Sequence, residues 1–241
     1  MTKTTIARRV LILGGGGMVG LQAAREIARK LSPERIIISA LTAPEVDEAL
    51  ESLQKEADDQ GWSTRFVAES GDIFLPKTLQ GKSRRDLVTD RELFNALFDD
   101  IFSSDTEGYR NSGLYGLIEK HEPDVVIDCI NTATAISYQD VYTTSRRVKV
   151  FLDRLENEKE LRSEDVDPFV ESIRELLIAQ GVPQIVRHIL YLHRALSERD
   201  GVAYGLVNIA VPGETSGTLL VSGQLAAAEQ VLASQPAAYV T

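Results

Sequence analysis

A glycine-rich turn near the amino end of the chain restricts the possible folds more than any other feature of the sequence. Residues 14–20 read Gly-Gly-Gly-Gly-Met-Val-Gly and directly follow the apolar run Val10-Leu11-Ile12-Leu13. After the turn, apolar residues recur at four-residue spacing, which is typical of an amphipathic helix: Val19, Ala23, Ile27 and Leu31. The pattern predicts a buried strand, a tight turn and a helix in succession.

The segments that follow repeat this alternation of strand and helix. Residues 35–40 (RIIISA) and 64–68 (TRFVA) read as strands, and the polar helix between them closes at Gly61. Residues 123–130 form the clearest later strand, and residues 202–211 are strand-like. Such alternation calls for a parallel sheet with right-handed crossovers and helices on both faces. We therefore predict the α/β class, with the doubly wound parallel sheet of a Rossmann fold.

The length of the chain suits one substantial core. With 241 residues it fits a single domain, which we predict over residues 1–241. Residues 138–167 are dense in charge and poor in core formers, so we interpret them as an exposed helical insertion within that domain. Helical periodicity returns over residues 169–197. Earlier in the chain, Thr89-x-x-Glu92 resembles a capping box and predicts the start of a helix.

Charge and cysteine content exclude several classes of protein. The formal net charge of −10 argues against a nucleic-acid partner, which needs Lys and Arg gathered on one surface. The lone Cys129 excludes an internal disulfide framework and favours a reducing compartment, so we expect a cytoplasmic protein. We expect no membrane span, because no stretch of about 18 uninterrupted apolar residues occurs. His188 and His193 are off the spacing that stacks ligands on one helical face, so we predict no metal site.

The glycine turn allows two spacings, and Gly15-x-Gly17-x-x-Gly20 is the general dinucleotide fingerprint. One glycine makes the tight turn, one lets the backbone approach the pyrophosphate, and one lets the helix pack on the strand. The anion rests on free N–H groups at the helix N-terminus. We therefore predict NAD or NADP as cofactor; the alternative is a turn that only packs. The candidate cofactor-binding residues of the turn are Gly14, Gly15, Gly17, Met18, Val19 and Gly20.

The sequence leaves the choice between NAD and NADP open. An acidic residue about 20 positions after the fingerprint usually holds the ribose 2′-OH of NAD. Here the second strand ends Ser39-Ala40-Leu41-Thr42, which is neither acidic nor basic. We include Ser39 among the candidate cofactor-binding residues.

The second spacing is Gly14-x-x-Gly17-x-x-Gly20. It occurs together with Gly71-Asp72-Ile73 after the third strand and with residues 122–128 (EPDVVID) at the fourth. This set resembles the extended short-chain dehydrogenase/reductase superfamily of the NAD-dependent epimerase and dehydratase type, over about residues 8–135. The resemblance implies that Asp72 and Ile73 lie at the adenine, and that Asn131, Thr132 and Ala133 border the ribose and nicotinamide. It also implies that Thr215 or Ser216 polarises a substrate oxygen, although a plain turn also accounts for both.

The catalytic Tyr-x-x-x-Lys pair of that superfamily is missing. None of the seven tyrosines has a lysine four residues later, and the nearest imitation is Tyr142-x-x-x-Arg146. The resemblance implies an NAD(P)-binding oxidoreductase-like protein that acts on a nucleotide sugar or another small carbonyl or hydroxyl substrate. The alternative is a non-catalytic dinucleotide-binding or sensing module. Enzymatic activity, the identity of the small-molecule substrate and a homodimer all stay open at this point.

Overall fold

A computed structural model describes residues 8–102, 107–130, 141–158, 163–179, 181–198 and 203–206. The chain divides into two compact units. The first takes in the described parts of residues 1–73, 113–131 and 191–241, and the second those of residues 74–112 and 132–190. A single domain over residues 1–241 stays a prediction.

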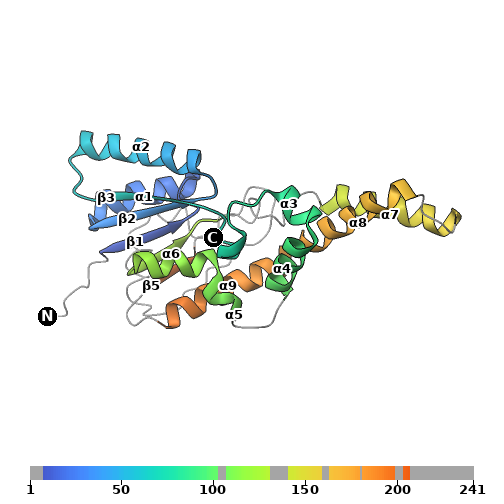
Figure 1. Ribbon diagram of the computed structural model, residues 1–241. Helices are drawn as coiled ribbons and strands as arrows, with labels where there is room; N and C mark the ends of the chain where they lie inside the picture. The colour runs from blue at the N-terminus through green and yellow to red at the C-terminus, as the bar shows by residue number, and fades with distance from the viewer. Residues whose placement is uncertain are drawn as a thin grey trace. The chain divides into compact units, whose positions relative to one another are not determined.

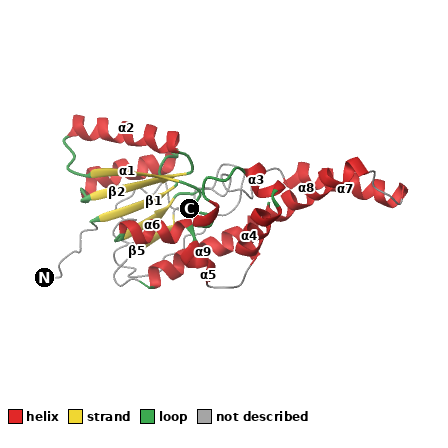
Figure 2. Cartoon of the chain, in the orientation of Figure 1, coloured by secondary structure: helices red, strands yellow, loops and turns green. Residues whose placement is uncertain are grey.

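The first unit is built on an all-parallel sheet (Figures 1 and 2). Its strands lie in the order β3-β2-β1-β4-β5. They are β1 (Arg9–Leu13), β2 (Arg35–Ala40), β3 (Arg65–Ser70), β4 (Val125–Asp128) and β5 (Ala203–Leu206). The prediction of a parallel α/β sheet is confirmed, and β2 has the predicted bounds. The strand predicted over residues 64–68 begins one residue later and ends at Ser70.

Helices α1 (Met18–Leu31) and α2 (Ala43–Gln60) cover one face of this sheet, and α6 (Gly113–His121) completes the helices that lie wholly in the first unit. The apolar stripes of α1 and α2 supply Ala24, Ile27, Ala28, Val46, Ala49, Leu53 and Ala57 to the core. These residues pack against strand side chains at Val10, Ile12, Ile36, Ile38, Phe66, Val125 and Ile127. Strand positions of the opposite parity are buried too: Leu11, Leu13, Ile37 and Val126. Each fully buried Leu or Ile stabilises the fold by roughly 1.5–3 kcal/mol, so the strand cores are the rigid platform of this unit.

The second unit is helical in its described part. It contains the 3₁₀ turn η1 (Lys77–Leu79), α3 (Arg84–Thr89), α4 (Arg91–Phe102), α5 (Glu107–Asn111), α7 (Val141–Glu158), α8 (Ser163–Ile178) and most of α9 (Gly181–Ser197). Its core comprises Leu75, Leu79, Leu87, Val88, Phe94, Leu97, Ile101 and Ile178. Helix α7 lies within the predicted insertion, whereas α8 begins in it and continues beyond it. The two helices pack together through Phe151 and Phe169, whose ring centroids are 5.4 Å apart. No helix of the described residues is long and apolar enough to cross a membrane.

The capping box predicted at Thr89-x-x-Glu92 is wrong, because Thr89 is the last residue of α3. Asp90 caps α4 instead. Its Oδ1 accepts hydrogen bonds from the backbone N–H groups of Glu92, at 2.8 Å, and Leu93, at 3.0 Å. The carboxylate of Asp90, one residue after the predicted cap Thr89, thus accepts hydrogen bonds from two amides of the first turn of α4.

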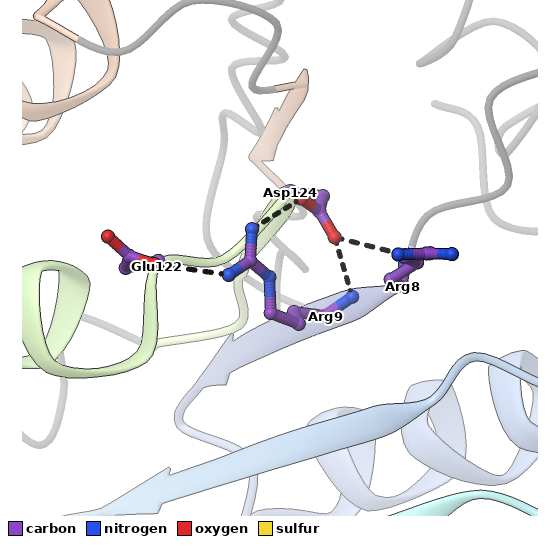
Figure 3. Close-up of polar contacts among 4 residues, drawn as sticks. All are labelled: Arg8, Arg9, Glu122 and Asp124. Carbon is purple, nitrogen blue, oxygen red and sulfur yellow. Dashed lines mark hydrogen bonds and ion pairs between the residues drawn. The ribbon is translucent and has the colours of Figure 1, made fainter.

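A charged cluster joins the beginnings of β1 and β4 (Figure 3). Asp124 Oδ2 accepts from the backbone N–H groups of Arg8, at 3.0 Å, and Arg9, at 2.8 Å. The Arg9 guanidinium donates to Asp124 Oδ1 at 3.0 Å and to Glu122 Oε2 at 3.3 Å. Partial burial alone would raise the pKa of Asp124, but the hydrogen bonds and charge of Arg9 outweigh it and lower the pKa below its ordinary value.

The lowered pKa of Asp124 makes a pH dependence of stability expected. The ionised carboxylate stabilises the fold above its unfolded pKa of about 3.9, and this contribution is lost as the pH falls through the lower folded pKa. At pH 7 we expect Asp124→Asn to lower the free energy of unfolding by about 1 kcal/mol, because the pair is partly solvated. Urea denaturation should show this difference in unfolding free energy shrinking as the pH falls from about 3.9, the unfolded pKa, through the lower folded pKa. Exposed Asp47 provides the control, Asp47→Asn, which should show no such difference. If the difference in unfolding free energy between the parent and Asp124→Asn persists in acid, the charge of Asp124 is not its cause.

Candidate functional site

The glycine turn begins where β1 ends, and β1 has a neighbour on each side. Leu13 is in register with Ser39 of β2 and with Asp128 of β4. The chain runs outward from β1 to β2 and β3 on one side and reaches β4 on the other, so the strand order reverses here. In open parallel sheets, ligands bind outside the carboxyl ends of the strands at such a switch point. The turn therefore lies where this sheet is expected to bind a ligand.

The first half of the turn is held tightly from both sides. Gly14 has φ +70°, a conformation that favours glycine, and a Cβ there would lie 3.0 Å from the Cys129 carbonyl atoms. The Gly15 N–H donates to the Ser39 carbonyl oxygen at 2.8 Å, and a Cβ on Gly15 would lie 2.8 Å from Ile38 Cγ2. These contacts fix the path of the backbone between β2 and β4.

The surroundings of Gly20 and Gly17 differ in whether they would allow a side chain. A Cβ on Gly20, in the first turn of α1, would clash with the Gly14 carbonyl oxygen and lie 2.6 Å from Gly15 Cα. A Cβ on Gly17 would meet only the Gly14 carbonyl oxygen, at 3.4 Å, which is an ordinary contact. Gly17 also has φ −77° and ψ 164°, which other residues adopt freely. The fold therefore requires glycine at Gly20, whereas at Gly17 it leaves open the space that a side chain would fill.

The N-terminus of α1 is arranged to accept an anion. The first N–H groups of a helix have no partner within it, and here they belong to Met18, Val19 and Gly20. Gly17, the N-cap, has no side chain to cap them, and the first turn contains no acidic residue. Met18 is 89% exposed, so solvent or a ligand can reach this end of the helix. The amides and the positive end of the helix dipole together suit a phosphate group.

The other predicted residues that the structure describes lie at the carboxyl ends of β2 and β3. Ser39 is buried, and its carbonyl oxygen accepts the Gly15 N–H of the turn. Gly71, with φ 144°, donates its N–H to the Ala40 carbonyl at 3.0 Å and leads β3 into Asp72 and Ile73. Ile73 is buried. Binding of adenine by Asp72 and Ile73 stays a prediction.

Sequence reasoning missed two acidic residues near the turn. Asp128 is buried at the end of β4, and its Oδ1 accepts the Ile130 N–H at 3.0 Å. Glu45, in the first turn of α2, accepts the Thr42 N–H through Oε2 at 3.0 Å. The pattern Thr42-x-x-Glu45 is a capping-box signal that could have revealed the second of them.

Cys129 lies beside Gly14 but is unsuited to nucleophilic chemistry. Burial, reinforced by the charge of Asp128, raises the pKa of the Cys129 thiol to about 12. The thiol therefore stays protonated at neutral pH, and the thiolate is the reactive form. Its role at the turn is packing.

The remaining predicted site residues lie outside the described part of the chain. These are Asn131, Thr132, Ala133, Thr215 and Ser216. Their roles at the nicotinamide and at a substrate oxygen stay predictions. Among the described residues, no group of three or more His, Cys, Asp and Glu could hold a metal ion.

Comparison with solved structures yields distant likenesses. No protein-family model matches the chain, and no curated protein matches it. The terminal R domain from the myxalamid PKS-NRPS biosynthetic pathway is 16% identical with a TM-score of 0.33, over 85% of this chain and 49% of that one. Pen from Bacillus thuringiensis is 13% identical with a TM-score of 0.29, over 66% of this chain and 59% of that one. The chain thus spans about half to three fifths of these structures, and at such TM-scores neither likeness supports an inference.

Proposed function

We propose that this chain binds NAD or NADP at the glycine turn, within a doubly wound Rossmann fold. The strand order β3-β2-β1-β4-β5 matches the first five strands of the 3-2-1-4-5-6 order of that fold. One observation carries the proposal: the fold does not require glycine at Gly17, yet the open space lies at the uncapped N-terminus of α1. A pyrophosphate would use that space, with the amides of Met18, Val19 and Gly20 as donors.

We further propose an oxidoreductase-like protein of the short-chain dehydrogenase type, with a nucleotide sugar or another small carbonyl or hydroxyl compound as substrate. The support is the combination of the turn with Gly71-Asp72-Ile73 after β3. The cofactor, when bound, would supply or accept a hydride. In this proposal Asn131, Thr132 and Ala133 border the nicotinamide, and Thr215 or Ser216 polarises the substrate oxygen. A lone cysteine fits a reducing compartment, so we place the protein in the cytoplasm.

A second candidate function is a dinucleotide-binding or sensing module without catalysis. The observation in its favour is that no tyrosine of the sequence has a lysine four residues later. A neighbouring lysine lowers the pKa of the tyrosine so that it can transfer a proton, and general acid–base assistance supplies typically ~10²–10⁴-fold in rate. The two candidates share the binding site and differ only in turnover.

Binding and turnover can be measured separately on the chain. We expect NAD or NADP to raise the thermal midpoint, because a ligand at about 100 times its Kd stabilises the native state by about 2.7 kcal/mol. The oxidoreductase candidate predicts a change in NAD(P)H absorbance with aldehydes, ketones or sugar nucleotides, whereas the sensing module, favoured by the missing Tyr-x-x-x-Lys pair, predicts little or none. No thermal shift with any dinucleotide would refute the binding proposal. Robust turnover that disappears in Tyr142→Phe would identify Tyr142 and Arg146 as a catalytic pair and exclude the sensing module.

A further inference from the structure

The N-terminal turns of the neighbouring helices α1 and α2 differ in whether they already contain a negative charge. They follow the adjacent parallel strands β1 and β2, so both begin at the same edge of the sheet. The N-terminus of α1 has no side-chain cap and no acidic residue. That of α2 is already occupied by a carboxylate, because Glu45 Oε2 accepts the Thr42 N–H at 3.0 Å. An anion is therefore favoured at α1 and opposed at α2.

The first turn of α2 lies directly against the glycine turn. A Cβ on Gly16 would lie 3.3 Å from the Glu45 carbonyl oxygen and 3.0 Å from Ala40 Cβ. The backbone of Glu45 is thus a neighbour of the proposed pyrophosphate-binding loop. The hydrogen bond to Thr42 restricts the Glu45 side chain to the end of α2 that borders the loop.

The segment that carries Glu45 provides no positive charge for a ribose 2′-phosphate. Residues 39–46 read Ser-Ala-Leu-Thr-Ala-Pro-Glu-Val and contain neither lysine nor arginine. Ser39 is 3% exposed, and the exposed residue that follows β2 is the apolar Leu41, at 47%. A ribose 2′-phosphate beside this segment would meet the Glu45 carboxylate, and residues 39–46 offer no cation to offset it. A ribose hydroxyl, in contrast, can donate a hydrogen bond to that carboxylate.

We propose that Glu45 makes the cofactor site selective for NAD over NADP; this inference rests on the proposed binding of a dinucleotide at the glycine turn. Glu45 accepts a hydrogen bond from the adenosine ribose and repels a 2′-phosphate. In the usual fingerprint the acidic residue with this role comes soon after the glycines, at the end of the second strand. Here that strand ends without one, and the carboxylate comes from the first turn of α2.

Glu45→Gln tests the role of the charge with little change in structure, because a glutamine oxygen can still accept the Thr42 N–H. The measurement is the Kd of NAD⁺ and NADP⁺ for the full chain by calorimetric titration. We expect the parent to bind NAD⁺ at least about tenfold more tightly, and the variant to lose about tenfold of this preference. The preference of the parent should also shrink at high salt, where exposed charges are screened. Glu51→Gln, which removes another exposed carboxylate of α2 further from the turn, should leave it unchanged.

The possible results separate the inference from the function on which it rests. If neither dinucleotide binds the parent, the proposed function fails and the inference fails with it. If both bind but NADP⁺ binds as tightly as NAD⁺, the function stands and the selectivity inference is overturned. An unchanged preference in Glu45→Gln, with a thermal midpoint equal to that of the parent, would also overturn it. A change of equal size in Glu51→Gln would assign the effect to the overall charge of α2, against a specific role of Glu45.

Discussion

Gly17→Val is expected to weaken dinucleotide binding by at least ~100-fold, equivalent to about 2.7 kcal/mol, while the free protein keeps its fold. A valine fits the extended backbone of Gly17, and its Cβ would meet only the Gly14 carbonyl oxygen at an ordinary 3.4 Å. The same side chain would occupy the space in which we place the pyrophosphate. Thermal shifts with NAD⁺ and NADP⁺, and the thermal midpoint without ligand, measure the two effects separately.

Gly20→Ala provides the matched control, because it places a Cβ on the other side of the same turn. That atom would clash with the Gly14 carbonyl oxygen and lie 2.6 Å from Gly15 Cα. Overpacking of this kind costs about 1–3 kcal/mol, so we expect the midpoint of the free protein to fall by roughly 5 °C. If Gly17→Val binds both dinucleotides as tightly as the parent, the turn serves packing alone and the proposed function is wrong.

Asp100→Asn is expected to destabilise the second unit by about 3–5 kcal/mol, because it removes the carboxylate charge that Asp100 supplies to a buried guanidinium. Asp100 of α4 and Arg187 of α9 form an ion pair whose side chains are each only 9% exposed. Arg187 also donates to the Phe74 carbonyl oxygen, so its position is fixed. The pair at Arg9 and Asp124 is about 30% exposed on each side, which explains the much smaller effect expected there.

Urea denaturation of three proteins tests this expectation: the parent, Asp100→Asn, and a double variant with Asp100→Leu and Arg187→Met. The double variant removes both charges, and replacing a complete buried pair by apolar residues is often nearly neutral. We therefore expect it to be more stable than the single variant. A single variant as stable as the parent would show that the guanidinium finds solvent or another partner.

Much of the first unit could be predicted because its signals are local. Residues 35–40 form a strand with the predicted bounds, since three consecutive isoleucines suit a buried parallel strand on both faces. The glycines of residues 14–20 form a turn between a strand and a helix, as the fingerprint requires. Each of these features depends on residues close together in the sequence.

Other features could not be predicted from residues close together in the sequence. Thr89 and Asp90 are both good helix caps, and only the end of α3 decides between them. The position of Glu45 beside Gly16 depends on how β1 and β2 are paired, which the periodicity of either strand does not specify. The contact of Gly14 with Cys129 depends on pairing between distant strands. Residue spacing therefore predicted the strand, turn and helix that form the site, but not which residues from other segments contact them.

The pairing of β1 with both β2 and β4 has a consequence for the order in which the site is assembled during synthesis. The neighbours of the turn on the β2 side, Ile38, Ala40 and Glu45, leave the ribosome soon after the glycines. Those on the β4 side follow much later, since Arg9 and Asp124, which join the two strands, are 115 residues apart. Closing a long loop is slow relative to local contacts. A nascent chain therefore has the β2 side of the glycine turn well before the β4 side, and the proposed binding site is complete only after β4 has paired.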